Sequence, residues 1–151
     1  MKLLLATRNP GKVREAGRLL AHLPLELVSL DEEGIGEEAE ETGETFEENA
    51  AQKSLFYSSR TGLYTVAEDS GLEVDALDGR PGVRSARYGG PELDDAGRLR
   101  RVLDEKEGVE TDRRTARFVS CDATSRGGRL LGTWRGTVEG RLLTETRGDG
   151  G

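Results

Sequence analysis

The sequence contains one cysteine, one histidine and one tryptophan, and only 5% of its 151 residues are aromatic. A single cysteine, Cys121, excludes a disulfide bond within the chain and is typical of a reducing compartment such as the cytoplasm. Because Cys121 lies in an apolar stretch, we expect it to be a small buried side chain rather than a nucleophile. The single histidine, His22, falls late in the first expected helix, so we expect a carboxylate to act as any catalytic base.

Long apolar runs and an excess of positive charge are also missing. No stretch is long enough to cross a bilayer, and the apolar start at residues 1–6 is too short for a signal peptide and is followed by Arg8. The formal net charge of −7 argues against nucleic acid or anionic membrane as a partner. A phosphorylated substrate would therefore need local lysines or a divalent cation.

What is present indicates one folded domain over residues 1–151. Hydrophobic and charged residues each make up 34% of the chain, which is polar but keeps several apolar runs. Strand and helix patterns follow one another without a repeat or a low-complexity tract. This succession predicts an α/β fold with a mixed sheet.

The N-terminus predicts a strand, a turn and a helix. Residues 2–6 form a compact apolar run that predicts a first, central strand, and a helix follows with apolar positions on one face: Val13, Ala16, Leu19, Leu20 and Leu23. The turn between them would present free backbone N–H groups and a positive helix end to an anion. Lys12, at the helix start, makes sense beside a phosphate, although an ordinary turn with a solvated lysine has the same pattern.

A second helix is predicted after an acidic segment at residues 31–48. Thr45 and Glu48 fit a capping box, and an apolar stripe follows through Phe46, Ala50 and Tyr57. Asn49 and Lys53, four residues apart, share a neighbouring stripe that could face a polyphosphate. A plain surface helix would have the same spacing.

The stretch at residues 67–72 stands out because Glu68 and Asp69 are adjacent after an apolar run. We expect the run at residues 63–66 to end a buried strand and Gly71 to turn the backbone away. Adjacent side chains on a strand point to opposite faces, so both carboxylates could reach one metal only if the strand has ended there. A solvated turn is the simpler interpretation of this stretch alone.

The remaining elements have clear signals. Residues 25–30 and 74–77 are strand-like, residues 79–90 predict a turn-rich loop with three arginines, and residues 91–107 predict a helix with Leu93, Ala96, Leu99 and Leu103 on one face. Residues 116–123 and 130–136 predict two strands joined by a hairpin at residues 126–129, and residues 137–141 can continue the second strand. The end, residues 147–151, is glycine-rich.

Four blocks, taken together and in order, resemble the dITP/XTP pyrophosphatases, a family that includes inosine triphosphate pyrophosphatase. The blocks are Thr7-Arg8-Asn9-Pro10-Gly11-Lys12; Glu41-Thr42-Gly43 with Thr45-Phe46 and Glu48-Asn49-Ala50; Glu68-Asp69-Ser70-Gly71-Leu72; and Pro81-Gly82 with Ser85-Ala86-Arg87-Tyr88. The resemblance implies an elongated, two-lobed α/β fold with helices around a central mixed sheet. It also implies a cytoplasmic homodimer that uses Mg²⁺ to hydrolyse the noncanonical purine nucleotides ITP, dITP and XTP to the monophosphate and pyrophosphate.

The resemblance also implies roles for individual residues. Asp69 matches the catalytic acidic residue, which orients or deprotonates the attacking water and binds metal. Glu40 matches the other metal ligand, with Glu68 a further candidate. The substrate-binding residues would be Thr7, Arg8, Asn9, Pro10, Gly11, Lys12, Lys53 and Ser70. Carboxylate ligands for Mg²⁺ and lysines for phosphate agree with the chemistry of such hydrolysis.

The sequence departs from the family at residue 151. In the family a similar glycine-rich stretch continues into Phe-Gly-Tyr-Asp-Pro and, later, a Ser-His-Arg motif, which read the purine base. We therefore expect the phosphate and metal half of the site without the C-terminal base-recognition segment. This leaves an alternative open: a non-catalytic nucleotide- or metal-binding remnant of the same fold.

Overall fold

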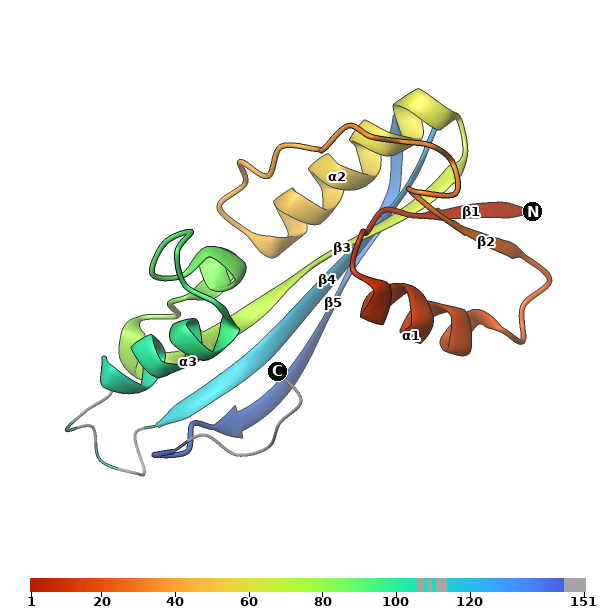
Figure 1. Cartoon of the computed structure of the whole chain (residues 1–151). Coiled ribbons are helices and arrows are strands. Elements are labelled where there is room, and N and C mark those ends of the chain that lie inside the picture. The colour runs from red at the N-terminus through yellow and green to blue at the C-terminus, as the bar shows by residue number, and fades with distance from the viewer. Residues whose placement is uncertain (106–107, 109, 111–113, 146–151) are drawn as a thin grey trace. The chain divides into compact units, whose positions relative to one another are not determined.

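The computed structural model describes residues 1–105, 108, 110 and 114–145. Within these residues, five strands form one sheet in the order β2-β1-β3-β4-β5 (Figure 1). The strands are β1 (Lys2–Leu5), β2 (Glu26–Ser29), β3 (Tyr64–Val74), β4 (Thr115–Arg126) and β5 (Arg129–Arg141). The helices are α1 (Pro10–Leu20), α2 (Phe46–Thr61), α3 (Asp95–Asp104) and two 3₁₀ helices, η1 (Asp75–Leu77) and η2 (Gly82–Arg87). The predicted α/β class with a mixed sheet is confirmed.

The first three strands place their connecting helices on opposite faces of the sheet. β1 pairs in parallel with both β2 and β3. The chain moves one way across the sheet from β1 to β2 and the other way from β2 to β3, so right-handed crossovers put α1 and α2 on different faces (Figure 1). The connections diverge at the carboxyl end of β1, and such switch points are where open α/β sheets bind ligands.

The chain divides into two compact units, Met1–Asp69 with Cys121–Arg135, and Ser70–Ser120 with Gly136–Gly151. The core of the first unit packs side chains from β1, β2, α2, β3 and the residues directly after β1 and β2, namely Leu4, Ala6, Val28, Leu30, Tyr57 and Ala67. The core of the second unit contains Val74, Leu77, Val102 and Ala116. All of the predicted site residues except Ser70 lie in the first unit.

Several local predictions are confirmed. Thr45 and Glu48 form the capping box of α2, and the stripe through Phe46, Ala50 and Tyr57 is buried. β4 and β5 form the expected hairpin, in which Gly127 and Gly128 both have positive φ, as a two-residue hairpin turn requires. Cys121 is buried, and burial, followed by the neighbouring Glu47 carboxylate, raises its pKa to about 12, which suits a structural thiol.

The expectation that a strand ends before Glu68 is wrong. β3 runs without interruption from Tyr64 to Val74 and passes through Gly71. Gly71 does not make a turn. It lets η2 approach β3 closely, because a side chain at Gly71 would collide with Ser85 and the carbonyl of Gly82. The strand-like segment at residues 74–77 is also corrected: only Val74 belongs to a strand, and η1 follows it.

The helical faces were predicted less well than the helices. α1 buries none of its side chains completely, and Leu19 remains 66% exposed. α3 spans only Asp95–Asp104 and buries Val102, whereas the predicted face residue Leu99 is 40% exposed. His22 lies beyond the end of α1 and is exposed. Of the predicted helix at residues 91–107, residues 106 and 107 lie outside the described residues, as does the glycine-rich end from residue 146.

Candidate functional site at the carboxyl end of β1

The loop after β1 is ordered by its own asparagine. Asn9 caps α1: its side-chain oxygen accepts hydrogen bonds from the backbone N–H of Gly11 at 2.8 Å and of Lys12 at 3.4 Å. Val13 donates to the Asn9 carbonyl. The free N–H groups expected at this helix start are therefore occupied, and a phosphate could use them only by displacing the Asn9 amide.

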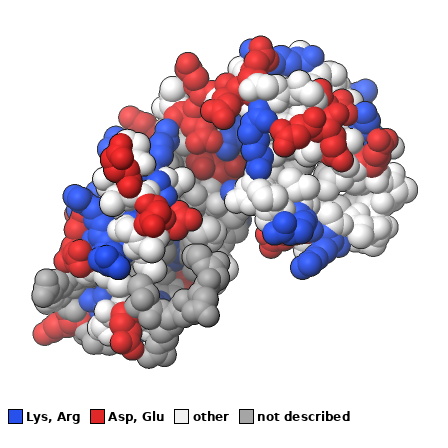
Figure 2. Space-filling model, in the orientation of Figure 1, with Lys and Arg blue, Asp and Glu red and all other residues white. Residues whose placement is uncertain are grey.

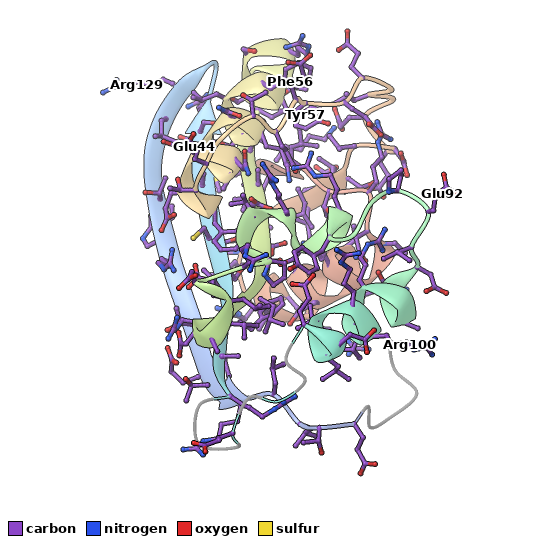
Figure 3. All side chains as sticks on the ribbon, turned by 90° about the vertical axis from the view of Figure 1, so that its left-hand side faces the viewer. Glu44, Phe56, Tyr57, Glu92, Arg100 and Arg129 are labelled. Atoms are coloured by element: carbon purple, nitrogen blue, oxygen red, sulfur yellow. The ribbon has the colours of Figure 1, made fainter. Side chains whose placement is uncertain are left out.

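Arg8, in the loop after β1, contacts the acidic segment of residues 31–48. Its guanidinium donates to the Asp31 carboxylate at 2.8 Å and to the Ile35 carbonyl at 2.6 Å. The same segment is tied to α2 by Tyr57, whose hydroxyl donates to the Glu37 carbonyl at 3.1 Å. The acidic segment is therefore held both by Arg8 of the loop after β1 and by Tyr57 of α2. Figure 3 labels Phe56 and Tyr57, which project from α2 and meet edge to face.

Lys12 reaches β3 from the first turn of α1. Its ammonium forms an ion pair with the Glu68 carboxylate, and both side chains are partly exposed. Pro10 begins the helix, and its first turn carries no acidic residue. The sequence predicts Lys12 near an anion, and the structure pairs it with the Glu68 carboxylate.

Asn49 holds Asp69 from the opposite side of the sheet. It is completely buried in α2, and its amide nitrogen donates to an Asp69 carboxylate oxygen at 3.0 Å. Its amide oxygen accepts from the Gly43 N–H at 2.8 Å. Because the amide donor is neutral, this hydrogen bond orients the carboxylate without neutralising its charge. Gly43 allows this approach: a Cβ there would lie 2.7 Å from Glu48 Cβ and 2.8 Å from Asn49 Oδ1.

Lys53, one turn further along α2, contacts the same region of β3. Its ammonium donates to the Glu68 carbonyl at 3.1 Å and pairs with the Glu41 carboxylate. The geometry of the strand explains this contact. The Val66 carbonyl accepts from the Ala6 N–H at the end of β1, and the carbonyl two residues further along, at Glu68, points to the same sheet edge beyond that end. α2 is therefore not a plain surface helix.

The two predicted metal ligands lie in different surroundings. Glu40 is exposed and lines a pocket with Glu38, Thr42, Gln52 and Phe56, whereas its neighbour Glu41 reaches Lys53. Glu68 faces α1 and Asp69 faces α2, as expected for adjacent residues of an unbroken strand. Within the described residues, no group of three or more acidic, histidine or cysteine side chains could hold a metal ion.

The sequence analysis missed Asp122 in β4. Its carboxyl is half-buried, and its pKa is raised by burial and by the nearby Glu68 charge, against the opposing effect of Lys12. One signal was available, since Asp122 is the only charged residue in the otherwise apolar or hydroxyl-bearing run of residues 118–124. Ser70 follows Asp69 in β3 and belongs to the second unit.

The surface around these elements carries both signs of charge. On the face in Figure 2, acidic and basic groups are interspersed among the described atoms, without one broad basic area. In the described part of the chain, none of the helices has the length and apolar character needed to cross a bilayer. The positive charge at the switch point comes from three separate side chains, Arg8, Lys12 and Lys53, each beside an acidic partner.

A parallel βαβ start, a capped loop at its switch point, and two lysines that contact β3 beside its carboxylates define an α/β protein with a candidate anion-binding site. A family model described as the Ham1 family matches residues 3–151. The chain belongs to the Ham1 family.

Named relatives agree with this assignment. The chain is 45% identical over 148 residues to a dITP/XTP pyrophosphatase of Bacillus subtilis, a match that covers 98% of this chain and 75% of the relative. It is 48% identical over 153 residues to a protein of the same name from an Exiguobacterium species.

Solved structures share the fold over the whole chain. A HAM1 protein from Coxiella burnetii superposes with a TM-score of 0.91 at 35% identity, covering 100% of this chain and 77% of that one. The nucleoside-triphosphatase / dITP/XTP pyrophosphatase of Mycobacterium abscessus superposes with a TM-score of 0.84 at 41% identity, with 100% and 79% covered.

Proposed function

We propose that this protein is a nucleoside-triphosphate pyrophosphatase that hydrolyses the noncanonical purine nucleotides ITP, dITP and XTP to the monophosphate and pyrophosphate. Relatives of this name match nearly the whole chain at 45% identity. An enzyme that removes such nucleotides from the pool would work in the cytoplasm, and we propose that it does so as a homodimer.

The observation that carries this proposal is the arrangement around Glu68 and Asp69. Lys12 from α1 pairs with the Glu68 side chain, Lys53 from α2 contacts the Glu68 backbone, and Asn49 orients Asp69. Two lysine ammonium groups beside an oriented carboxylate suit attack of water on a phosphoanhydride. In that reaction the negative charge of the phosphates must be stabilised and the attacking water must be positioned.

Each residue would have a defined task. Asp69 would accept a hydrogen bond or a proton from the attacking water, and Asn49 would keep its carboxylate in place. Lys53 would stabilise the charge on the phosphates, and Lys12 would bind them with the capped loop of residues Thr7, Arg8, Asn9, Pro10 and Gly11. Ser70, next to Asp69 in the chain, would contact the substrate.

The donor chemistry of this region fits Mg²⁺. The ion prefers oxygen ligands and often takes only one or two carboxylates, with water and substrate phosphates completing its shell, so a cluster of three protein ligands is not required. We propose Asp69 and Glu40 as the ligands. When bound, Mg²⁺ would neutralise phosphate charge.

The test is release of pyrophosphate from ITP, XTP and ATP with Mg²⁺, comparing the protein with Asp69→Asn. Loss of a positioned carboxylate base is expected to lower kcat by about 100-fold or more. Glu92→Gln, at an exposed position in the second unit (Figure 3), removes one carboxylate charge elsewhere and should retain full activity. Release that is equal in the protein and Asp69→Asn would refute the proposed role.

The same assay separates the alternatives for the substrate and for catalysis. Faster release from ITP and XTP than from ATP would support selectivity for noncanonical purines. Equal release from all three would support pyrophosphatase chemistry without that selectivity. Mg²⁺-dependent binding of ITP without any release would favour the non-catalytic remnant.

A further inference from the structure

Asp122 lies on the same face of the sheet as Glu68. β4 is the neighbour of β3. In β4, Cys121, Ala123 and Ser125 are completely buried, and the Ser125 hydroxyl donates to Ser58 of α2 at 2.9 Å. Side chains alternate along a strand, so Asp122 points away from α2.

The same alternation in β3 places Glu68 opposite α2. Ala67 packs in the cluster that contains Tyr57 of α2, and Asp69 accepts a hydrogen bond from Asn49 of α2. Glu68, between them, pairs with Lys12 of α1. Glu68 and Asp122 therefore extend from adjacent strands toward the helix that carries Lys12.

The charges of these three groups influence one another. Burial raises the pKa of Asp122 most, the Glu68 carboxylate raises it further, and Lys12 lowers it. The ammonium of Lys12 therefore pairs with Glu68 of β3 and acts on the Asp122 carboxylate of β4 through its charge. Glu15, three residues further along α1, is exposed to solvent and offers a carboxylate for comparison.

We propose that Asp122 is a positioning residue that, with Glu68, holds the ammonium of Lys12 against the sheet and competes for it with the phosphates of the substrate. This inference rests on the proposed function, in which Lys12 binds phosphate. Its consequence is weak binding of polyphosphate in the absence of a divalent cation, because the anion must separate Lys12 from two carboxylates. Substitution of Asp122 by a neutral residue should release Lys12 for the anion.

The first experiment measures the lysine without any ligand. The protein, Asp122→Asn, Asp122→Glu and Glu15→Gln are treated briefly with an amine-specific acylating reagent, and modification at each lysine is quantified by mass spectrometry. Because a paired ammonium must leave its partners before it reacts, Asp122→Asn should increase labelling of Lys12 about two- to fivefold, with Lys2 unchanged as the internal reference. Asp122→Glu and Glu15→Gln should remain within about twofold of the unmodified protein.

The second experiment measures binding of inorganic pyrophosphate in EDTA by calorimetry. Asp122→Asn should lower Kd about three- to tenfold, whereas Asp122→Glu and Glu15→Gln should leave it nearly unchanged. The gain should disappear when Lys12 is also replaced by methionine. In turnover of ITP, the matching result is a lower KM with little change in kcat.

Two results would overturn the inference. One is unchanged labelling of Lys12 in a folded Asp122→Asn protein, and the other is a Kd for pyrophosphate that is equal or higher in that variant. Failure of the proposed function looks different: no release of pyrophosphate from ITP by the unmodified protein, while labelling of Lys12 still responds to Asp122. The labelling experiment decides the inference even when the chain does not turn over nucleotide.

Discussion

Replacing Asn49 with alanine removes the side chain that joins α2, the acidic segment and β3. Asn49 is completely buried, accepts from the Gly43 N–H at 2.8 Å and donates to Asp69 at 3.0 Å. The variant loses one hydrogen bond between neutral groups and one to a carboxylate. At about 1 kcal/mol for the first and 1.5–3 kcal/mol for the second, the free energy of unfolding should fall by about 2–4 kcal/mol.

Urea denaturation followed by circular dichroism measures this loss. With a slope of about 2 kcal/mol per molar urea, the midpoint should fall by about 1–2 M. Ser54→Ala is the matched control, because Ser54 is another completely buried polar residue of α2 whose hydroxyl donates only within the helix, to the Ala51 carbonyl at 3.2 Å. Its midpoint should fall by less than about 0.5 M.

Activity provides the second measurement on the same variant. Without the Asn49 amide, Asp69 loses a donor that fixes its carboxylate, so kcat for ITP should fall about 10- to 100-fold at a temperature where the variant stays folded. KM should change much less. A variant with the midpoint and kcat of the unmodified protein would refute the claim that Asn49 both stabilises this region and positions Asp69.

Two further predictions concern the same unit. Gly43→Ala should lower the free energy of unfolding by about 1–3 kcal/mol, because the new methyl group would crowd Glu48 and Asn49, whereas Gly36→Ala, with open space around it, should not; urea midpoints decide. Glu47 accepts a hydrogen bond from Arg135 at 3.0 Å, and this bond is the main cause of its lowered pKa. A pKa lowered in the folded state stabilises the protein above the unfolded value and ceases to do so as pH falls through the folded value. The stability difference between the protein and Glu47→Gln should therefore shrink from about pH 6 to pH 3 in urea titrations, and a difference independent of pH would contradict this account.

Local patterns in the sequence determined most of the element order. The run at residues 2–6, the capping box of Thr45 and Glu48, and the Gly127-Gly128 hairpin depend on neighbours within a few residues, and all three are present in the structure. The blocks of residues that resemble the pyrophosphatases also identified the family correctly. Such signals can be recognised in the sequence because capping and turn geometry depend on residues that are close in the chain.

The tertiary structure alone decided which charges meet. β3 continues past Asp69 because its register is set by pairing with neighbouring strands, and this continuity sends Glu68 toward α1 and Asp69 toward α2. Lys53 pairs with Glu41 and not with its neighbour Glu40, and this depends on the contacts that hold the acidic segment against α2, such as the hydrogen bond from Tyr57 to Glu37. The charges of Lys12 and Glu68 act on Asp122 only because β4, more than 50 residues later in the chain, lies beside β3. Contacts over such separations depend on how the sheet is assembled, and the local sequence does not encode them.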